Sequence, residues 1–283
     1  MRYINFSPDG HRRLLGVLQG TTIRSLGDVT LEELLAGGVD LTSYGNSAHD
    51  VGEEFAADSV TYLAPLTHPG KILCIGLNYA DHTNESPYEQ PTYPTIFPRY
   101  NSSLIGHQTP MIRPRVSDSL DFEGELAVIL GSGGRHIPKD RALSCVAGYS
   151  IFNDGSVREY QFKSPQWTVG KNFDGTGAFG PEFVTADELP AGGTGLKLET
   201  RLNGKVVQSA NTADMLHDVA SLISIISEAI TLEAGDVIVS GTPAGIGWAR
   251  EPKVIMRHGD VCEVEIEGLG VLRNHVADET LQA

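Results

Sequence analysis

Two glutamates separated by a single glycine open an apolar run within residues 120–130, and no other stretch constrains the fold as strongly. The segment 126–130 is apolar and partly β-branched, which predicts a buried strand. Because alternate residues of a strand point to the same face, Glu123 and Glu125 must lie side by side, with Gly124 leaving room for a bulky neighbour. Two carboxylates this close repel unless one is protonated or a cation lies between them. The pattern therefore predicts either a divalent-cation site or a solvated edge strand with an acidic outer face.

The composition is that of a globular protein with many turns. Of the 283 residues, 40% are apolar and 20% are charged, which allows a substantial core in one large domain or in a small domain joined to a larger one. The 32 glycines indicate a turn-rich fold with much β-structure. A formal charge of −15 argues against nucleic acid or an anionic membrane as a partner. An anionic substrate would need local positive charge from basic side chains and a bound metal.

Three cysteines, Cys74, Cys145 and Cys262, lie in apolar, strand-like surroundings, and no two have the spacing of a metal pair. They are expected to be buried free thiols, which suits a reducing cytoplasm. Residues 1–20 contain no sustained apolar segment and no small-residue cleavage site, so no secretory signal is predicted. No stretch approaches the apolar length of a membrane span. These features predict a cytoplasmic protein.

Residues 1–64 are predicted to form a small β-rich N-terminal domain. Turn residues between 3–6 and 14–18 favour a hairpin. Thr30 and Glu33 have the spacing of a capping box at the start of a short helix. No residue in this part indicates chemistry, so we expect it to have a supporting or dimerising role.

His82 and Glu85 follow a predicted strand at 71–76 and are three residues apart. One helical turn would bring the two side chains together, and a carboxylate orients an imidazole and raises its basicity. The pair predicts a general base or, alternatively, a weak contact on a surface turn. The proline-rich residues 86–101 cannot form a regular helix. We expect them to form either a lid over the site or a fixed covering loop.

Three further features of the sequence suit anion or metal chemistry. Asp154 ends the predicted strand 145–152, where it can supply a third oxygen ligand or serve in an ordinary Asp-Gly turn. Lys171 lies in a glycine-rich loop that lacks the spacing of a phosphate-binding loop, so nucleotide binding is excluded there. A lysine in such a loop is either solvated or reaches an anionic oxygen. The loop 241–247 is expected to expose backbone N–H groups to an anion.

The C-terminal part has one strong hairpin signal and one long helix. An Asn-Gly pair at 203–204 separates two strand-like runs. Apolar residues keep helical spacing through 216–230, and Asn211 or Thr212 is predicted to cap that helix. His217 would then lie on a packing helix and have a structural role.

In the order in which they occur, these stretches resemble the fumarylacetoacetate hydrolase family over residues 70–275. The resemblance rests on Asn78-Tyr79, His82 with Glu85, Asp121-Phe122-Glu123-Gly124-Glu125, Gly148-Tyr149, Asn153-Asp154, Arg158, Gln161, Lys171 and Gly241-Thr242-Pro243-Ala244-Gly245-Ile246-Gly247. Any one of these is weak, but together they are specific. The resemblance implies an α+β, mostly β fold with a mixed β-sandwich or β-roll catalytic domain in residues 65–283, assembled as a homodimer.

The resemblance also implies a metal site. Glu123, Glu125 and Asp154 would hold Mg²⁺ or Mn²⁺, with Ca²⁺ as a further hard cation, and would leave positions open for water and substrate. Substrate contacts are expected from Tyr79, Arg99, Arg158, Gln161 and Thr242. Many smaller members of the family have a lysine in the lid where Arg99 stands. The guanidinium group of an arginine can form two parallel hydrogen bonds, which indicates that the substrate is a different or larger anion.

The implied reaction is metal-stabilised enolate chemistry on a 2-oxo acid. For this chain we predict hydrolysis of a carbon–carbon bond in a 2,4-dioxo acid of the acylpyruvate or fumarylpyruvate type, giving pyruvate or a related product and a carboxylic acid. His82 backed by Glu85 would activate the water, and Lys171 would stabilise the oxyanion. Two alternatives stay open. One is an oxaloacetate decarboxylase or 2-hydroxydienedioate isomerase on the same scaffold, and the other is a non-catalytic metal-binding protein.

Overall fold

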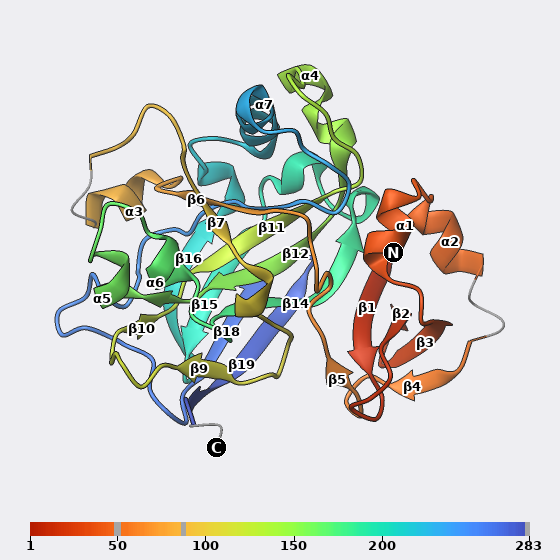
Figure 1. Ribbon diagram of the computed structural model, residues 1–283, viewed down its shortest axis with the longest axis horizontal. Coiled ribbons are helices and arrows are strands. Elements are labelled where there is room, and N and C mark those ends of the chain that lie inside the picture. The colour runs from red at the N-terminus through yellow and green to blue at the C-terminus, as the bar shows by residue number, and fades with distance from the viewer. Residues whose placement is uncertain (48–51, 86–88, 281–283) are drawn as a thin grey trace.

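A large mixed β-sheet runs through the molecule (Figure 1). The computed structural model describes residues 1–47, 52–85 and 89–280. Within these residues the sheet has twelve strands. In spatial order they are β4 (Glu54–Ala56), β3 (Thr22–Gly27), β2 (Leu14–Gln19), β1 (Arg2–Ser7), β14 (Gly177–Thr185), β12 (Val146–Asp154), β11 (Gly124–Leu130), β17 (Val237–Val239), β6 (Ile72–Gly76) and β7 (Thr95–Arg99), with β5 (Thr61–Tyr62) paired to β1 and β8 (Leu104–Ile105) paired to β14.

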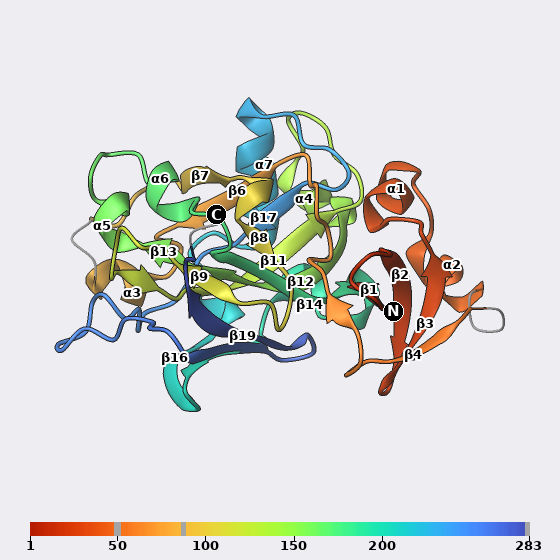
Figure 2. The ribbon, with the colours of Figure 1, turned by 60° about the horizontal axis from the view of Figure 1, so that its bottom comes forward.

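A second sheet packs against the middle of the first, over β11, β12 and β14 (Figure 2). Its order in the described residues is β16 (Lys205–Asn211), β15 (Lys197–Leu202), β18 (Val261–Ile266), β19 (Gly270–Asp278) and β9 (Met111–Arg113). A short antiparallel pair, β10 (Leu120–Asp121) with β13 (Ser156–Val157), lies beside it. The expected α+β, mostly β sandwich is therefore confirmed.

The helical segments are short and lie around the sheets. The α-helices are α1 (Leu31–Ala36), α2 (Leu41–Ser47), α3 (Ala80–Glu85), α4 (Lys139–Ala142), α5 (Arg158–Gln161), α6 (Thr168–Lys171) and α7 (Val219–Ala229). The 3₁₀ turns are η2 (Asn101–Ser103), η3 (Leu143–Cys145), η4 (Ala186–Glu188), η5 (Ala191–Gly193) and η6 (Thr212–Asp214). In the described part of the chain, no helix has both the length and the apolar character that crossing a bilayer requires.

Strand alternation along β11 separates two cores and sets the position of the acidic residues. Leu126 and Val128 point towards the second sheet and α7, whereas Ala127 and Ile129 point to the opposite face of the large sheet. Every residue of β11 is buried, because the strand lies between β12 and β17 in the middle of the sheet. The alternative of a solvated edge strand is therefore wrong. The glutamates at 123 and 125 continue the register of Ala127.

The N-terminal part contains the predicted hairpin and capped helix. β1 and β2 pair antiparallel, and Thr30 caps α1 in a reciprocal capping box with Glu33. β1 also pairs with β14, so the large sheet continues from the N-terminal strands into the rest of the chain. Figure 1 shows these strands, in red and orange, at one end of the sheet. The division into domains 1–64 and 65–283 stays a prediction.

The long helix begins later than the sequence predicted. Asp218 caps α7 by accepting a hydrogen bond from the Ser221 N–H, and the helix starts at Val219. Asn211 does form a capping box, but it caps the short turn η6. His217 precedes the helix instead of lying on it. The prediction was wrong because a good cap residue stood before a different, shorter helical turn.

The proline-rich segment includes a regular strand. β7 pairs antiparallel with β6 along five residues, from Ile72 opposite Arg99 to Gly76 opposite Thr95. This part of the predicted lid is thus fixed at the edge of the large sheet. Residues 86–88 of the predicted lid lie outside the described residues.

Candidate active site

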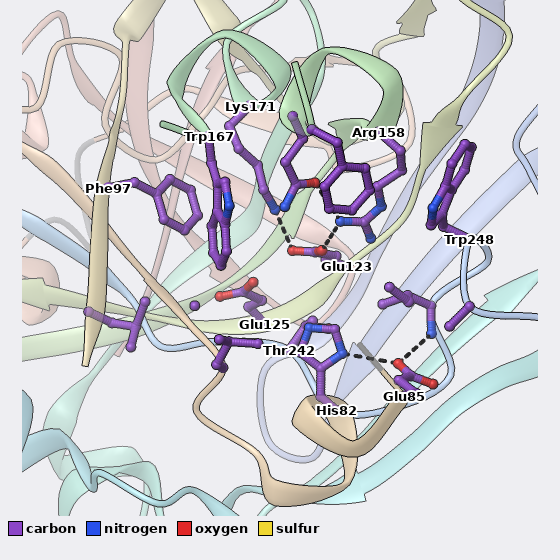
Figure 3. A pocket seen from close by; sticks show the side chains of 17 residues that line it. His82, Glu85, Phe97, Glu123, Glu125, Arg158, Trp167, Lys171, Thr242 and Trp248 are labelled. Carbon is purple, nitrogen blue, oxygen red and sulfur yellow. Dashed lines mark hydrogen bonds and ion pairs between the residues drawn. The ribbon is translucent and has the colours of Figure 1, made fainter. Parts of the chain in front are cut away.

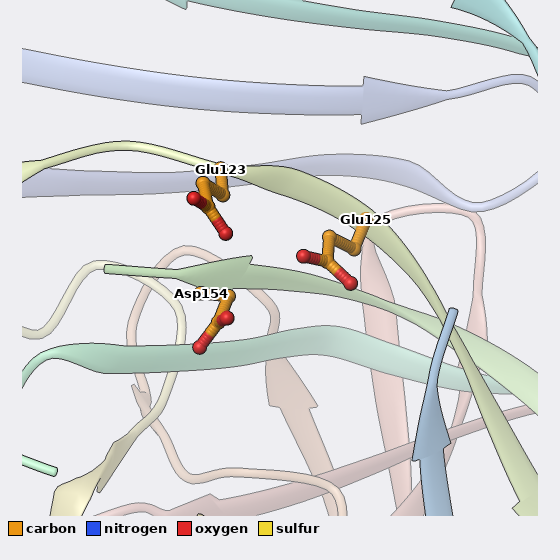
Figure 4. Close-up of side chains that lie close together, drawn as sticks. All are labelled: Glu123, Glu125 and Asp154. Atoms are coloured by element: carbon orange, nitrogen blue, oxygen red, sulfur yellow. The ribbon is translucent and has the colours of Figure 1, made fainter. Parts of the chain in front are cut away.

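Three carboxylates from two neighbouring strands meet on one face of the large sheet (Figure 4). Glu123 immediately precedes β11, Glu125 lies within it, and Asp154 ends β12. The backbone N–H of Asp154 donates to the Glu123 carbonyl at 2.8 Å. All three are buried, and one oxygen of each lies within 4.8 Å of the others. The structure thus brings together the three residues that the family resemblance implied as ligands: strand alternation places Glu123 beside Glu125, and the pairing of β11 with β12 brings in Asp154.

Three cationic side chains neutralise part of this charge. Lys171 Nζ donates to Glu123 Oε2 at 2.6 Å and to Asp154 Oδ2 at 2.7 Å. Arg158 Nη1 lies 2.6 Å from Glu123 Oε1, and Arg99 Nη1 donates to Asp154 Oδ1. Because these side chains are fully or almost fully buried, their charges are screened little by water. The triad is therefore held within a dense network of buried ion pairs.

The two glutamates of the triad differ in how their charge is compensated. Burial alone would raise the pKa of Glu123, but Lys171 and Arg158 outweigh that effect and lower this pKa to about 2. The pKa of Glu125 is raised well above its usual value by burial and by the carboxylates of Asp154 and Glu123. Glu125 accepts a hydrogen bond from the Gly241 N–H at 2.5 Å, and no ion pair to it is found among the described residues. Glu125 is thus the member that lacks a cation.

The triad fits a divalent metal ion. Three carboxylates are the hard oxygen donors that Mg²⁺, Mn²⁺ and Ca²⁺ prefer. Glu125, which has no ion pair among the described residues, marks the side of the triad where a further cation can bind. Glu123, Glu125 and Asp154 are therefore the residues that would hold such an ion.

A histidine–carboxylate pair faces the triad from the other side of the pocket (Figure 3). In α3, His82 Nδ1 lies 3.0 Å from Glu85 Oε1, as the three-residue spacing predicted. Glu85 also accepts hydrogen bonds from the N–H groups of Gly245, at 2.9 and 3.0 Å, and Ile246, at 3.3 Å. Since Glu85 can only accept from these groups, Nδ1 of His82 carries the proton that bonds it, and Nε2 is left free of this contact. Figure 3 shows that second ring nitrogen turned towards the triad glutamates.

The glycine-rich loop 241–247 does bind anions, but they are carboxylates of the chain itself. Its N–H groups donate to Glu125 and Glu85, and Gly247 N donates to Asp121 Oδ1 at 2.8 Å. Asp121 in turn accepts from Arg158 Nε at 2.9 Å and so orients the arginine. The expectation that this loop offers its N–H groups to a ligand is corrected for these positions. Asp121 is therefore a positioning residue, and its place in the motif 121–125 did not indicate this role.

Eight of the predicted site residues line one pocket. They are His82, Glu85, Glu123, Glu125, Arg158, Gln161, Lys171 and Thr242. Asp154 lies beneath this wall, bonded to Lys171 and Arg99. Tyr79 is buried away from the lining, and its hydroxyl has no hydrogen-bond partner within the described part of the chain. A direct substrate contact by Tyr79 therefore has no support from this geometry.

Arg99 also lies behind the triad and does not line the pocket. Besides Asp154, it donates to Ser103 Oγ at 3.2 Å, to Thr176 Oγ1 at 2.8 Å and to the Gly155 carbonyl at 3.2 Å. Its side chain is fully buried. The prediction of a lid arginine that binds a substrate anion is corrected: β7 carries Arg99 into the core, where it supports Asp154.

Comparison with known proteins decides the family. Residues 71–277 match the model of the family described as "Fumarylacetoacetate (FAA) hydrolase C-terminal". The chain belongs to the fumarylacetoacetate hydrolase family. This confirms the resemblance that the motifs indicated. The matched residues include the triad, the His82–Glu85 pair and the loop 241–247, which donates hydrogen bonds to Glu125 and Glu85.

Relatives within the fumarylacetoacetate hydrolase family carry names of several activities. The chain is 42% identical over 218 residues to the rat (Rattus norvegicus) protein named oxaloacetate tautomerase Fahd2a, mitochondrial, covering 77% of this chain and 69% of the relative. A solved fumarylacetoacetate hydrolase from psychrophilic Exiguobacterium antarcticum is 38% identical, with a TM-score of 0.85 over 99% of this chain and 100% of that one. A 2-hydroxyhepta-2,4-diene-1,7-dioate isomerase from Mycobacterium marinum is 31% identical, with a TM-score of 0.78 and the same coverage.

The apolar part of the pocket was not predicted from the sequence. Its lining includes Phe97 from β7, Trp167 before α6, Phe162 after α5, and Trp248 from the C-terminal loop. These residues come from four separate segments, so no local pattern connects them. The only usable signal was composition: both tryptophans of the chain, Trp167 and Trp248, stand close in sequence to predicted site residues.

Proposed function

We propose that the protein is a divalent-metal-dependent enzyme that transfers a proton at the carbon next to the keto group of a small 2-oxo acid, interconverting its keto and enol forms. One observation carries the proposal. His82 is bonded to Glu85 through one ring nitrogen and turns the other towards the acidic triad, across a pocket that both line. A base and a metal-binding group thus face the same small volume.

The residues of the chain have separable roles in such a reaction. Glu85 fixes the orientation and tautomer of His82, so that the free ring nitrogen accepts the substrate proton and later returns it. A metal ion held by the triad would supply Lewis-acid stabilisation of the negative charge that develops on the keto oxygen. Arg158 and Gln161, which are bonded to each other at 2.9 Å, line the wall beside Glu123 and orient polar substrate atoms.

Two observations support proton transfer as the complete reaction. Lys171, predicted as the oxyanion donor for hydrolysis, already donates to Glu123 and Asp154. The relative that is 42% identical is named as an oxaloacetate tautomerase, which is an enzyme of this reaction type. Oxaloacetate is accordingly the first substrate to test.

Hydrolysis of a carbon–carbon bond in a 2,4-dioxo acid is the second candidate. A Glu85-backed His82 can also deprotonate water, and the Exiguobacterium antarcticum structure that resembles this chain over its whole length is named as a hydrolase. This candidate requires Lys171 to leave one of its carboxylate partners when substrate binds.

The test follows substrates by NMR in D₂O with Mg²⁺ or Mn²⁺ added. Oxaloacetate, a 2-hydroxydienedioate and an acylpyruvate are supplied in turn. Tautomerase or isomerase activity gives deuterium at the carbon next to the keto group without loss of carbon, hydrolysis gives pyruvate and a carboxylic acid, and decarboxylation of oxaloacetate releases CO₂. We expect rapid deuterium exchange that His82→Gln lowers by about 10²- to 10⁴-fold. Absence of any turnover with either metal would leave the non-catalytic alternative.

Three expectations from the sequence belong to this proposal. Magnesium or manganese is the expected metal, since three carboxylates do not discriminate strongly between hard divalent ions. A homodimer is expected from the family resemblance. A cytoplasmic location is expected because all three cysteines are buried free thiols, although the rat relative is named as mitochondrial.

A further inference from the structure

We infer that the outer half of the pocket binds an uncharged, flat apolar group, so that the preferred substrate is a 2-oxo acid carrying an aromatic or similar substituent at its far end, with oxaloacetate a weaker one. The inference rests on the proposed function for one step, the placing of the 2-oxo acid head at the triad. Its other support is the chemistry of the pocket walls.

Aromatic rings form both sides of the pocket. On one side Phe97 and Trp167 pack edge-to-face, with ring centroids 5.5 Å apart. On the other side Phe162 and Trp248 lie 6.2 Å apart with an angle of 38° between their planes. Figure 3 shows Phe97 and Trp167 to one side of Glu123 and Trp248 to the other. A flat ring that enters between these walls would bury apolar surface on both of its faces.

The backbone makes room for the aromatic wall formed by Phe97 and Trp167. A Cβ atom at Gly76 would lie only 2.3 Å from Trp167 Cζ3, so the glycine lets the indole ring lie directly on β6. The next residue, Leu77, has a φ of 59°, a conformation that is unfavourable for a leucine. Strain of this kind persists only where the surrounding structure imposes it. Leu77 also lines the pocket, so its strained backbone presents one more apolar side chain to a ligand.

The cationic side chains of the pocket are concentrated at its inner end, beside Glu123. Among the described lining residues, the permanently charged cations are Arg158 and Lys171, and both form ion pairs with Glu123. Among the described residues, no hydrogen-bond partner is found for Nη2 of Arg158, whose Nη1 lies 2.6 Å from Glu123 Oε1. This nitrogen can bind a polar atom of the 2-oxo acid head.

Among the described residues that line the pocket, none at the outer end is a permanently charged cation that could pair with an anion. Lys253 lies near the wall formed by Phe162 and Trp248, but it is not a lining residue. Its ammonium group is placed over the Trp248 ring, 3.2 Å from the centroid. A second carboxylate between the aromatic walls would lose its hydration without gaining an ion pair. An apolar group in the same place would gain from leaving water.

The experiment compares two ligands that cannot react. N-Benzyloxamate and N-(carboxymethyl)oxamate share a 2-oxo acid head, and nitrogen replaces the carbon that would lose a proton. They differ in carrying a phenyl ring or a carboxylate. Binding to the full chain with Mn²⁺ is followed by tryptophan fluorescence, which reports on this pocket because both tryptophans of the protein line it. We expect N-benzyloxamate to bind about tenfold or more tightly than the carboxymethyl ligand.

Two variants and one control sharpen the comparison. Phe162 is 41% exposed, so Phe162→Ala should fold normally while lowering affinity for the benzyl ligand by about five- to tenfold and leaving the carboxymethyl ligand unchanged. Phe162→Arg should favour the carboxymethyl ligand by about fivefold over its affinity for the unmodified protein. Tyr100→Ala is the matched control, since Tyr100 is 54% exposed and does not line the pocket.

The outcomes separate this inference from the proposed function. Equal or tighter binding of N-(carboxymethyl)oxamate would overturn the inference, and proton exchange on oxaloacetate in the NMR assay would then leave the proposed function standing. Loss of carboxymethyl binding in Lys253→Ala would identify the residue that receives the second carboxylate and would overturn the inference as well. Failure of both oxamates to bind would overturn the inference together with the placing of the 2-oxo acid head.

Discussion

The pocket brings together the acidic triad and the His82–Glu85 pair, and their carboxylates are held by different kinds of groups. In the triad, side-chain cations from β7, α5 and α6 form ion pairs with Asp154 and Glu123. In the His82–Glu85 pair, Glu85 is held by two backbone N–H groups of the loop after β17 and by the imidazole ring. The triad lies on strands in the middle of the sheet, whereas the pair lies on the short helix α3.

The difference shows how a fold can prepare two groups for different tasks. The side-chain cations of the triad pair with Glu123 and Asp154, so a metal ion could add its charge at Glu125 while Lys171 keeps its contacts. A backbone N–H cannot leave without moving the chain, so Glu85 and hence His82 keep one orientation. A carboxylate that no side-chain cation neutralises suits metal binding, and an imidazole with a fixed orientation suits proton transfer.

The largest expected effect comes from the triad member without a cation. Glu125→Gln should lower metal-dependent turnover by about 10³- to 10⁴-fold, since it weakens the metal site while keeping an acceptor for the Gly241 N–H. The metal-free protein should not lose stability, because burial and two neighbouring carboxylates already raise the pKa of Glu125 well above its usual value. Mn²⁺ calorimetry, turnover and denaturant unfolding measure the three quantities. If Glu125→Gln kept its turnover but lost stability, Glu125 would have a structural role and would not be the metal-binding member of the triad.

Arg99→Met tests whether the triad depends on its buried cations. Asp154 would lose a partner whose side chain is fully buried, and we expect the free energy of unfolding to fall by about 3–5 kcal/mol. Arg113→Met is the control, because Arg113 pairs with the more exposed Asp118 and Asp278 and should contribute about 1 kcal/mol or less. Equal losses in the two variants, measured by urea unfolding, would argue against a structural role for Arg99.

Glu85→Gln tests the fixed orientation of the base. The amide keeps an oxygen for the backbone N–H groups but removes the charge that supports an imidazolium ion, so turnover should fall about 100-fold. Mn²⁺ affinity should be unchanged, because Glu85 is not one of the clustered metal-binding carboxylates. A parallel loss of Mn²⁺ affinity and turnover would show that the two groups are not independent.

His107, like Glu85, accepts a hydrogen bond from a backbone N–H, but it lies outside the pocket. Its Nδ1 accepts a hydrogen bond from the Arg273 N–H at 3.0 Å, and burial, with a smaller contribution from Arg273, lowers its pKa from 6.5 to about 4. Between these values the unfolded chain binds the proton more strongly, so stability should decrease as pH falls from 6.5 to 4, by at most about 3 kcal/mol.

Urea unfolding at pH 7 and pH 4.5 measures this loss. His107→Asn, which keeps an acceptor but cannot titrate, should show a smaller loss than the unmodified protein. The matched control is His258→Asn, since His258 also accepts a backbone N–H, at 3.2 Å, but has a side chain that is 67% exposed. An unchanged pH dependence in His107→Asn would exclude this histidine as its source.

The features predicted correctly from the sequence depend on short-range geometry. Strand alternation places Glu123 beside Glu125, and one helical turn joins His82 to Glu85. The features that were missed depend on long-range packing. Nothing near Arg99 in the sequence shows that its partner is Asp154, and the spacing of loop 241–247 does not reveal that its N–H groups are already bonded to the chain's own carboxylates.

One glycine restricts how this site can be changed. Behind the triad, a Cβ atom at Gly124 would lie 2.3 Å from Thr200 Oγ1 and 2.9 Å from Val264 Cγ1, both in the second sheet. Any larger residue would wedge the sandwich apart and turn both adjoining glutamates. A mutant library that seeks new metals or substrates should therefore keep Gly124 unchanged and vary the aromatic residues of the pocket walls instead.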